Sequence, residues 1–154
     1  MRSWKNICCP IDFSASSRKA LVHAAELTRE ARGQLALVHV HEGASAKLRR
    51  VLGVSSREVY DEEIAEARES LAREVERADA IAPGRVSAQL AGGDAAESIL
   101  HYLRNHRCDL LVVARHGGAM RSRRKTLGRV AEKIVKSAPC TVIVVRPDAL
   151  FAVG

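Results

Sequence analysis

The chain has 154 residues, of which 47% are apolar and 28% charged, a composition typical of one folded domain and not of a disordered chain. Lys and Arg number 25 against 18 Asp and Glu, so the formal net charge is +7, and only 3% of residues are aromatic. No apolar run approaches the ~18 residues of a membrane-spanning helix, and no signal-peptide pattern follows the N-terminus. We therefore expect a single cytoplasmic domain over residues 1–154 without membrane contact.

Short apolar runs predict strands, and apolar residues spaced three or four apart predict the helices between them. The strands are expected at Asn6–Ile11, Leu35–Val40, Arg85–Leu90, Asp109–Ala114 and Thr141–Val145. The helices are expected at Ser14–Arg32, from Ser55 to about Ala80, from Asp94 past Leu103, and at Leu127–Ser137. The stretch between His41 and Val54 has no clear period and is predicted to be a loop.

The ends and faces of these helices follow from a few side chains. Ser14 or Ser16 is expected to cap the first helix, and Gly33 to supply its left-handed end. Asp94 is expected to cap the third helix. The last helix is predicted to bury four apolar residues, namely Val130, Ala131, Ile134 and Val135.

Apolar strands that alternate with helices predict an α/β fold with a parallel sheet covered on both faces. Right-handed crossovers allow the strand order 3-2-1-4-5 in a single-domain, three-layer sandwich. The winding then reverses between the first and fourth strands, and ligands bind outside the carboxyl ends of strands at such a switch point. Pro10 and Asp12 follow the first strand, while Ala114, Gly117 and Gly118 end and follow the fourth.

The net charge is concentrated after the fourth strand. The stretch Arg115–Lys136 holds eight basic residues and one acidic residue, so the rest of the chain is balanced. Its glycines let a backbone approach a ligand closely, and the last helix begins near Gly128 with amides that suit an anion. The stretch predicts a phosphate-bearing ligand, nucleic acid or an acidic surface as partner, or simply a solvated loop. Scarce aromatic residues disfavour nucleic acid.

The four cysteines, Cys8, Cys9, Cys108 and Cys140, lack the spacing of a zinc site. We expect them to be reduced thiols that pack as small apolar groups, with no metal bound. Ser14, Asp12 and His116 can be drawn as a hydrolytic triad, but nothing in their spacing supports one. No catalytic residue is therefore predicted.

Five segments together resemble the universal stress protein family. They are Cys9-Pro-Ile-Asp-Phe-Ser14, Leu37-Val-His-Val40, Gly93-Asp-Ala-Ala-Glu-Ser-Ile99, Cys108-Asp-Leu-Leu-Val-Val113, and Leu127-Gly-Arg-Val-Ala-Glu-Lys-Ile134 followed by Ser137-Ala-Pro-Cys-Thr-Val-Ile-Val-Val145. The resemblance covers about Lys5 to Pro147. It implies a five-stranded parallel sheet, a homodimer and, in many members, ATP bound through a G-x2-G-x9-G-[S/T] motif.

This sequence matches that motif only in part. Ala114 stands where the first glycine is expected, and Gly117 matches the second. Gly128 matches the third, but ten residues separate it from Gly117 instead of nine, and Arg129 replaces the Ser or Thr that binds phosphate. The resemblance also implies that Asp12 contacts the adenine. The residues expected to contact the base (the base half of the site) thus match the family's pattern, whereas those expected to contact the phosphates (the phosphate half) depart from it.

The resemblance, taken with the switch point, predicts a stress-response protein that binds ATP or a related adenine nucleotide with Mg²⁺. At most it hydrolyses ATP slowly. The predicted nucleotide-binding residues are Pro10, Asp12, Val40, Val113, Ala114, Gly117, Gly118, Gly128, Arg129 and Val130. Two alternatives stay open: a family member that has lost nucleotide binding and acts through protein partners, and a basic adaptor for a polyanion. A homodimer through residues 141–145 is expected because an apolar, β-branched edge strand invites pairing.

Overall fold

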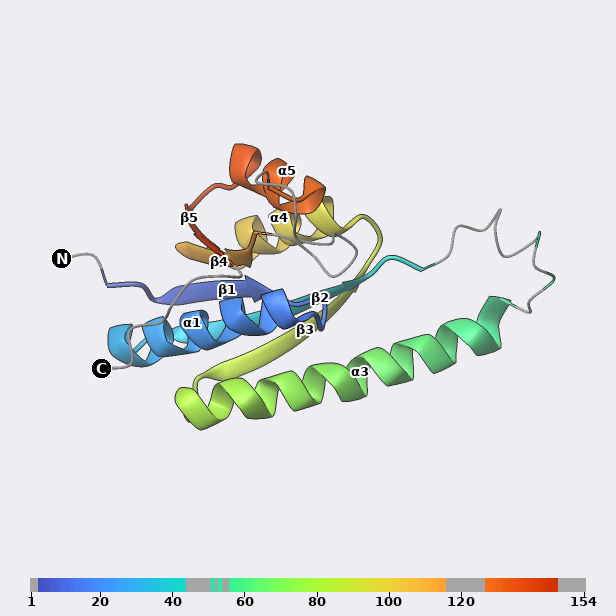
Figure 1. Cartoon of the computed structure of the whole chain (residues 1–154), viewed down its shortest axis with the longest axis horizontal. Helices are drawn as coiled ribbons and strands as arrows, with labels where there is room; N and C mark the ends of the chain where they lie inside the picture. The colour runs from blue at the N-terminus through green and yellow to red at the C-terminus, as the bar shows by residue number, and fades with distance from the viewer. Residues whose placement is uncertain (1–2, 44–50, 52, 54–55, 116–126, 147–154) are drawn as a thin grey trace.

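The computed structural model describes residues 3–43, 51, 53, 56–115 and 127–146. Strands and helices alternate along the chain, as the sequence predicts (Figure 1). The elements are β1 Asn6–Pro10, α1 Ala15–Ala31, β2 Gln34–His41, α3 Ser56–Ile81, β3 Val86–Gly92, α4 Ala95–Asn105, β4 Leu110–Ala114, α5 Arg129–Ser137 and β5 Thr141–Val145.

The strands form one parallel sheet in the order β3-β2-β1-β4-β5, which confirms the predicted order. Helices α1 and α3 cover one face and α4 and α5 the other, so the molecule has three layers (Figure 1). Side chains alternate along β1: Ile7 and Cys9 enter the core beneath α1 and α3, and Cys8 enters the core beneath α4 and α5. A sheet buried on both faces explains why its central strands read as continuous apolar runs.

Helix α5 buries less of its surface than predicted. Ala131 and Ile134 are buried, but Val130 and Val135 are each 40% exposed. The prediction that all four apolar residues are buried is therefore wrong. The helix has only nine residues and packs beside α4 near one side of the sheet, so one narrow stripe of its surface reaches the core.

The end of α1 also differs from the prediction. Ser14 is the N-cap, since its Oγ accepts a hydrogen bond from Ser17 N at 3.1 Å. The left-handed residue at the other end is Arg32, with φ 52°, and not Gly33. Gly33 is needed for a different reason: a Cβ there would lie 2.5 Å from the carbonyl oxygen of Trp4.

We expect Gly33→Ala to lower the free energy of unfolding by about 1–3 kcal/mol, because the added methyl group forces the backbone of Trp4 and Lys5 away. Urea unfolding followed by circular dichroism measures the change. Gly92→Ala is the control, since its Cβ would meet only the His41 oxygen, at 3.9 Å. Equal losses in both variants would contradict the steric explanation.

Candidate functional site

The two central strands stop pairing before they end. The β1–β4 register holds only Ile7 with Leu110 and Cys8 with Leu111, whereas β1 stays paired with β2 as far as Pro10. Proline lacks the N–H that would continue a ladder, so its position at the end of β1 suits this divergence. The chain then follows β2, with Ile11 N donating to Val38 O at 2.8 Å. The winding of the sheet reverses where the strands separate, at the switch point that the sequence predicts.

The turn after β1 carries Asp12, whose side chain is exposed at this end of the sheet. Its Oδ1 accepts a hydrogen bond from Ser14 N at 3.0 Å, which closes a local turn just before α1. Asp12 is thus not the cap of α1, because that position belongs to Ser14. Asp12 nevertheless stabilises the approach to the helix through this hydrogen bond.

Phe13, the next residue, adopts a backbone conformation that the sequence does not reveal. Its φ is +65°, in the left-handed region that large side chains seldom occupy. The Phe13 ring lies against the His39 ring with centroids 4.3 Å apart, and His39 Nδ1 donates to Ile11 O at 2.6 Å. His39 is therefore a half-buried, hydrogen-bonded residue that fixes the turn carrying Asp12.

The far end of β2 is joined to α3. His41 Nε2 lies 3.1 Å from a carboxylate oxygen of Glu63, and the His41 ring meets Tyr60 edge-on. Val40, between the two histidines, points to the opposite face and packs against the core beneath α4 and α5. Of the three residues, only Val40 was predicted to line the nucleotide.

The other side of the divergence is built from β4 and α5. Val113 and Ala114 are buried at the end of β4, and Arg115 N donates to Val145 O at 3.0 Å. Gly128 N donates to Arg115 O at 2.9 Å, which fixes the start of α5 directly beyond β4. The structure thus brings Gly128 next to the end of β4, as the sequence predicts. Gly117 and Gly118, and also His116, lie outside the described residues.

The start of α5 has no side-chain cap. Gly128 is the N-cap, and the first bond within the helix runs from Glu132 N to Gly128 O at 2.8 Å. The amides of Arg129, Val130 and Ala131 therefore have no partner within the helix, which is the arrangement that attracts anions. The side chains of Arg129 and Val130 are exposed.

A groove of about 600 Å³ lies elsewhere, on the side of α4 and α5. Its lining includes Ala91, Ser98, His101, Arg104 and Lys133, and none of the predicted nucleotide-binding residues. The groove mixes both charges, and Lys133 is already paired with Glu97 at 3.5 Å. The switch point, whose position follows from the strand order, is the stronger candidate for a ligand site.

Among the described residues, no three His, Cys, Asp or Glu side chains are grouped so as to hold a metal ion. None of the helices in the same ranges has both the length and the apolar character that a membrane crossing requires.

The strand order and the switch point define the chain as a doubly wound parallel α/β protein. A family model described as the universal stress protein family matches residues 3–146, and the chain therefore belongs to that family. No curated protein sequence matches the chain.

Solved structures share the fold at low sequence identity. The universal stress protein UspA from Lactobacillus plantarum is 23% identical, with a TM-score of 0.79, over 95% of this chain and 100% of its own. A universal stress protein in complex with cAMP is 16% identical, with a TM-score of 0.73, over 96% of this chain and 100% of its own. The universal stress protein from Archaeoglobus fulgidus in complex with dAMP is 20% identical, with a TM-score of 0.68, over 93% of this chain and 98% of its own.

Proposed function

We propose that this universal stress protein binds an adenine nucleotide, ATP or a related one, where β1 and β4 diverge. The observation that carries the proposal is the early end of the β1–β4 register, with Asp12 beyond one strand and the uncapped start of α5 beyond the other. A carboxylate suits the exocyclic amine of adenine or a ribose hydroxyl, and free amides suit phosphate. The two solved structures in complex with cAMP and dAMP support this choice of ligand.

The proposed site has a base half and a phosphate half. Pro10, Asp12 and Val40 would hold the base and ribose, with Val113 and Ala114 forming the floor. The phosphates would meet residues 128–130 and the glycines at 117 and 118. Mg²⁺ would arrive with a triphosphate, since the described residues offer no grouped metal ligands. The nucleotide is proposed to be a regulatory ligand, with at most slow hydrolysis.

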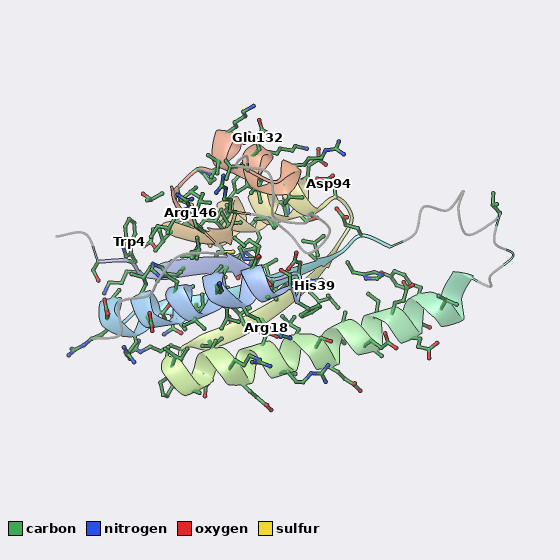
Figure 2. The ribbon with its side chains drawn as sticks, in the orientation of Figure 1. Trp4, Arg18, His39, Asp94, Glu132 and Arg146 are labelled. Carbon is green, nitrogen blue, oxygen red and sulfur yellow. The ribbon has the colours of Figure 1, made fainter. Side chains whose placement is uncertain are left out.

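Asp12→Ala tests the base half. We expect it to weaken ATP binding by about 1–3 kcal/mol, the usual cost of deleting a charged hydrogen-bond partner, as measured by isothermal titration calorimetry. Asp94→Ala is the matched control: Asp94 caps α4 by accepting from Glu97 N at 2.9 Å (Figure 2). Losing that cap should cost about 1 kcal/mol of stability and leave affinity unchanged. An unchanged affinity of Asp12→Ala for ATP would show that Asp12 does not contact the base and that the base pocket lies elsewhere.

The polyanion alternative is weakened by the ion pairs of α5. Lys133 pairs with Glu97, and Lys136 pairs with Glu132 at 3.1 Å, so two of the basic residues already have acidic partners. A thermal shift with ATP separates nucleotide binding from both alternatives. Retention on heparin that falls as salt rises would instead support a polyanion.

We also propose a homodimer through β5. This strand is an edge of the sheet, its residues Val142, Ile143 and Val144 are only half-buried, and exposed Val130 and Val135 lie on α5. Sedimentation at micromolar concentration should give the mass of two chains. Ile143→Lys should shift the protein toward the monomer, because it places a charge on the paired edge. A wild-type monomer would contradict the proposal.

A further inference from the structure

Three of the four cysteines meet on the α4/α5 face of the sheet. Cys8 lies in β1, Cys108 lies just before β4, and Cys140 immediately precedes β5. Cys8 and Cys108 belong to one buried cluster, against which Cys140 and Tyr102 pack. Cys9 follows Cys8 directly but points to the opposite face, into the core beneath α1 and α3. The four thiols are all free.

Backbone hydrogen bonds hold Cys108 in this place. Asp109 N donates to Asn6 O at 2.9 Å, and the Asp109 carboxylate accepts from Lys5 N at 2.9 Å and from Asn6 N at 3.1 Å. Cys108 N donates to Leu103 O at 3.1 Å, which ties the same turn to the end of α4. The approach of Cys108 to β1 is therefore fixed by the fold.

The thiols of Cys8 and Cys108 lie within hydrogen-bonding reach of each other, with Cys8 as the donor. This bond raises the pKa of Cys8, which burial raises further. The same bond lowers the pKa of Cys108, against the opposing effects of burial and of the Asp109 carboxylate. Cys108 is thus the sulfur with the greater thiolate character, and the thiolate is the reactive form.

Solvent exposure, like the pKa shifts, favours Cys108 over Cys8 as the thiol that is oxidised first. Cys108 keeps 9% of its surface exposed, whereas Cys8 has none. Of these two thiols, Cys108 is therefore the one that an oxidant from solvent reaches more easily, while Cys140 is more exposed than both. Burial raises the pKa of Cys140 to about 11 and also raises that of Cys9, so neither competes as a thiolate near neutral pH.

We propose that Cys108 and Cys8 form a dithiol that a peroxide oxidises to an intramolecular disulfide. The Cys108 thiolate attacks one oxygen of hydrogen peroxide, the O–O bond breaks, and hydroxide leaves, so Cys108 becomes a sulfenic acid. The sulfur of Cys8 then attacks the sulfur of Cys108. An S–S bond forms, and the sulfenic hydroxyl leaves with the Cys8 proton as water. Two electrons pass from the sulfurs to the peroxide, which ends as two molecules of water.

The wild-type chain provides the first test. The folded protein is treated with hydrogen peroxide, blocked with N-ethylmaleimide and digested with trypsin without reduction. We expect the peptide Asn6–Arg18 to be joined to Cys108–Arg115, with a mass lower by two hydrogen atoms than the sum of the two. Dithiothreitol should separate them. Cys108 joined to Cys140, or a disulfide between two chains, would overturn the proposal.

Cys8 and Cys9 lie on the same tryptic peptide, so variants must separate them. Cys9→Ala is the matched control, since it removes an equally buried neighbour on the other face and should leave the cross-link intact. Cys108→Ser should abolish the cross-link and leave Cys8 reduced. Cys8→Ala should instead let Cys108 accumulate as sulfenic and sulfinic acid. Circular dichroism checks that each variant is folded, and a cross-link lost in Cys9→Ala but retained in Cys8→Ala would refute the pairing.

Discussion

Replacing Ile134 with alanine is expected to lower the free energy of unfolding by about 2–5 kcal/mol. Ile134 is fully buried, and Ile134 and Ala131 are the residues through which the nine-residue helix α5 packs on the core. Such a short helix has little stability of its own and depends on tertiary packing. Chemical denaturation measured at several denaturant concentrations gives the change directly.

Val135→Ala is the control for this prediction. Val135 neighbours Ile134 on the same helix, but its side chain is largely outside the core. Its truncation should change stability by about 0.5 kcal/mol or less, as is usual for surface positions. Equal losses of stability in the two variants, measured on the monomer, would contradict the assignment of Ile134 and not Val135 to the buried face of α5.

Arg18→Ala is expected to cost about 1.5–3 kcal/mol of unfolding free energy, the range for a hydrogen bond to a charged group. Glu74, on the buried side of α3, is 2% exposed, and its Oε1 accepts from Arg18 Nε on α1 at 3.0 Å (Figure 2). Removing Arg18 leaves a carboxylate inside the protein with much weaker compensation. Thermal and chemical unfolding of the same variant both measure this loss.

Two further variants separate the pair from its surroundings. Arg77 lies 3.7 Å from the same oxygen and is mostly exposed, so Arg77→Ala should cost less than about 1 kcal/mol. Glu74→Leu replaces the carboxylate with an apolar group of similar size and should be close to neutral, because it removes the buried charge. A large loss in Glu74→Leu together with none in Arg18→Ala would contradict this account.

The strand order could be predicted because buried parallel strands are apolar along their whole length and right-handed crossovers limit their arrangement. The bounds of β5 agree with the prediction for the same reason. The burial of Glu74 could not be predicted, since a carboxylate on a long charged helix usually faces solvent. The exposure of Val130 and Val135 was missed because a helical period does not reveal how wide a stripe the sheet covers.

The candidate site was predictable in outline only. Asp12 and Ala114 lie at the same edge of the sheet because the carboxyl ends of parallel strands meet there, and the strand order makes that edge a switch point. This placement does not depend on the conformations of their side chains. The left-handed φ of Phe13 and its contact with His39 depend on tertiary packing that leaves no local signal in the sequence. The ligand, the dimer, the cytoplasmic location and a role in stress response stay predictions.

Of the strands in this sheet, β1 is synthesised before the others, and it lies at the centre of the sheet. On the ribosome, β1 gains β2 early, but its other neighbour begins only at Leu110. Until then, one side of β1 is an open edge on a nascent chain, and such edges pair readily with foreign strands. Pro10 offers no N–H on that edge, and Asp12 places a charge just beyond it. Pro10, whose missing N–H suits the end of the β1–β4 pairing in the folded protein, is therefore expected also to limit pairing of this edge with foreign strands during synthesis.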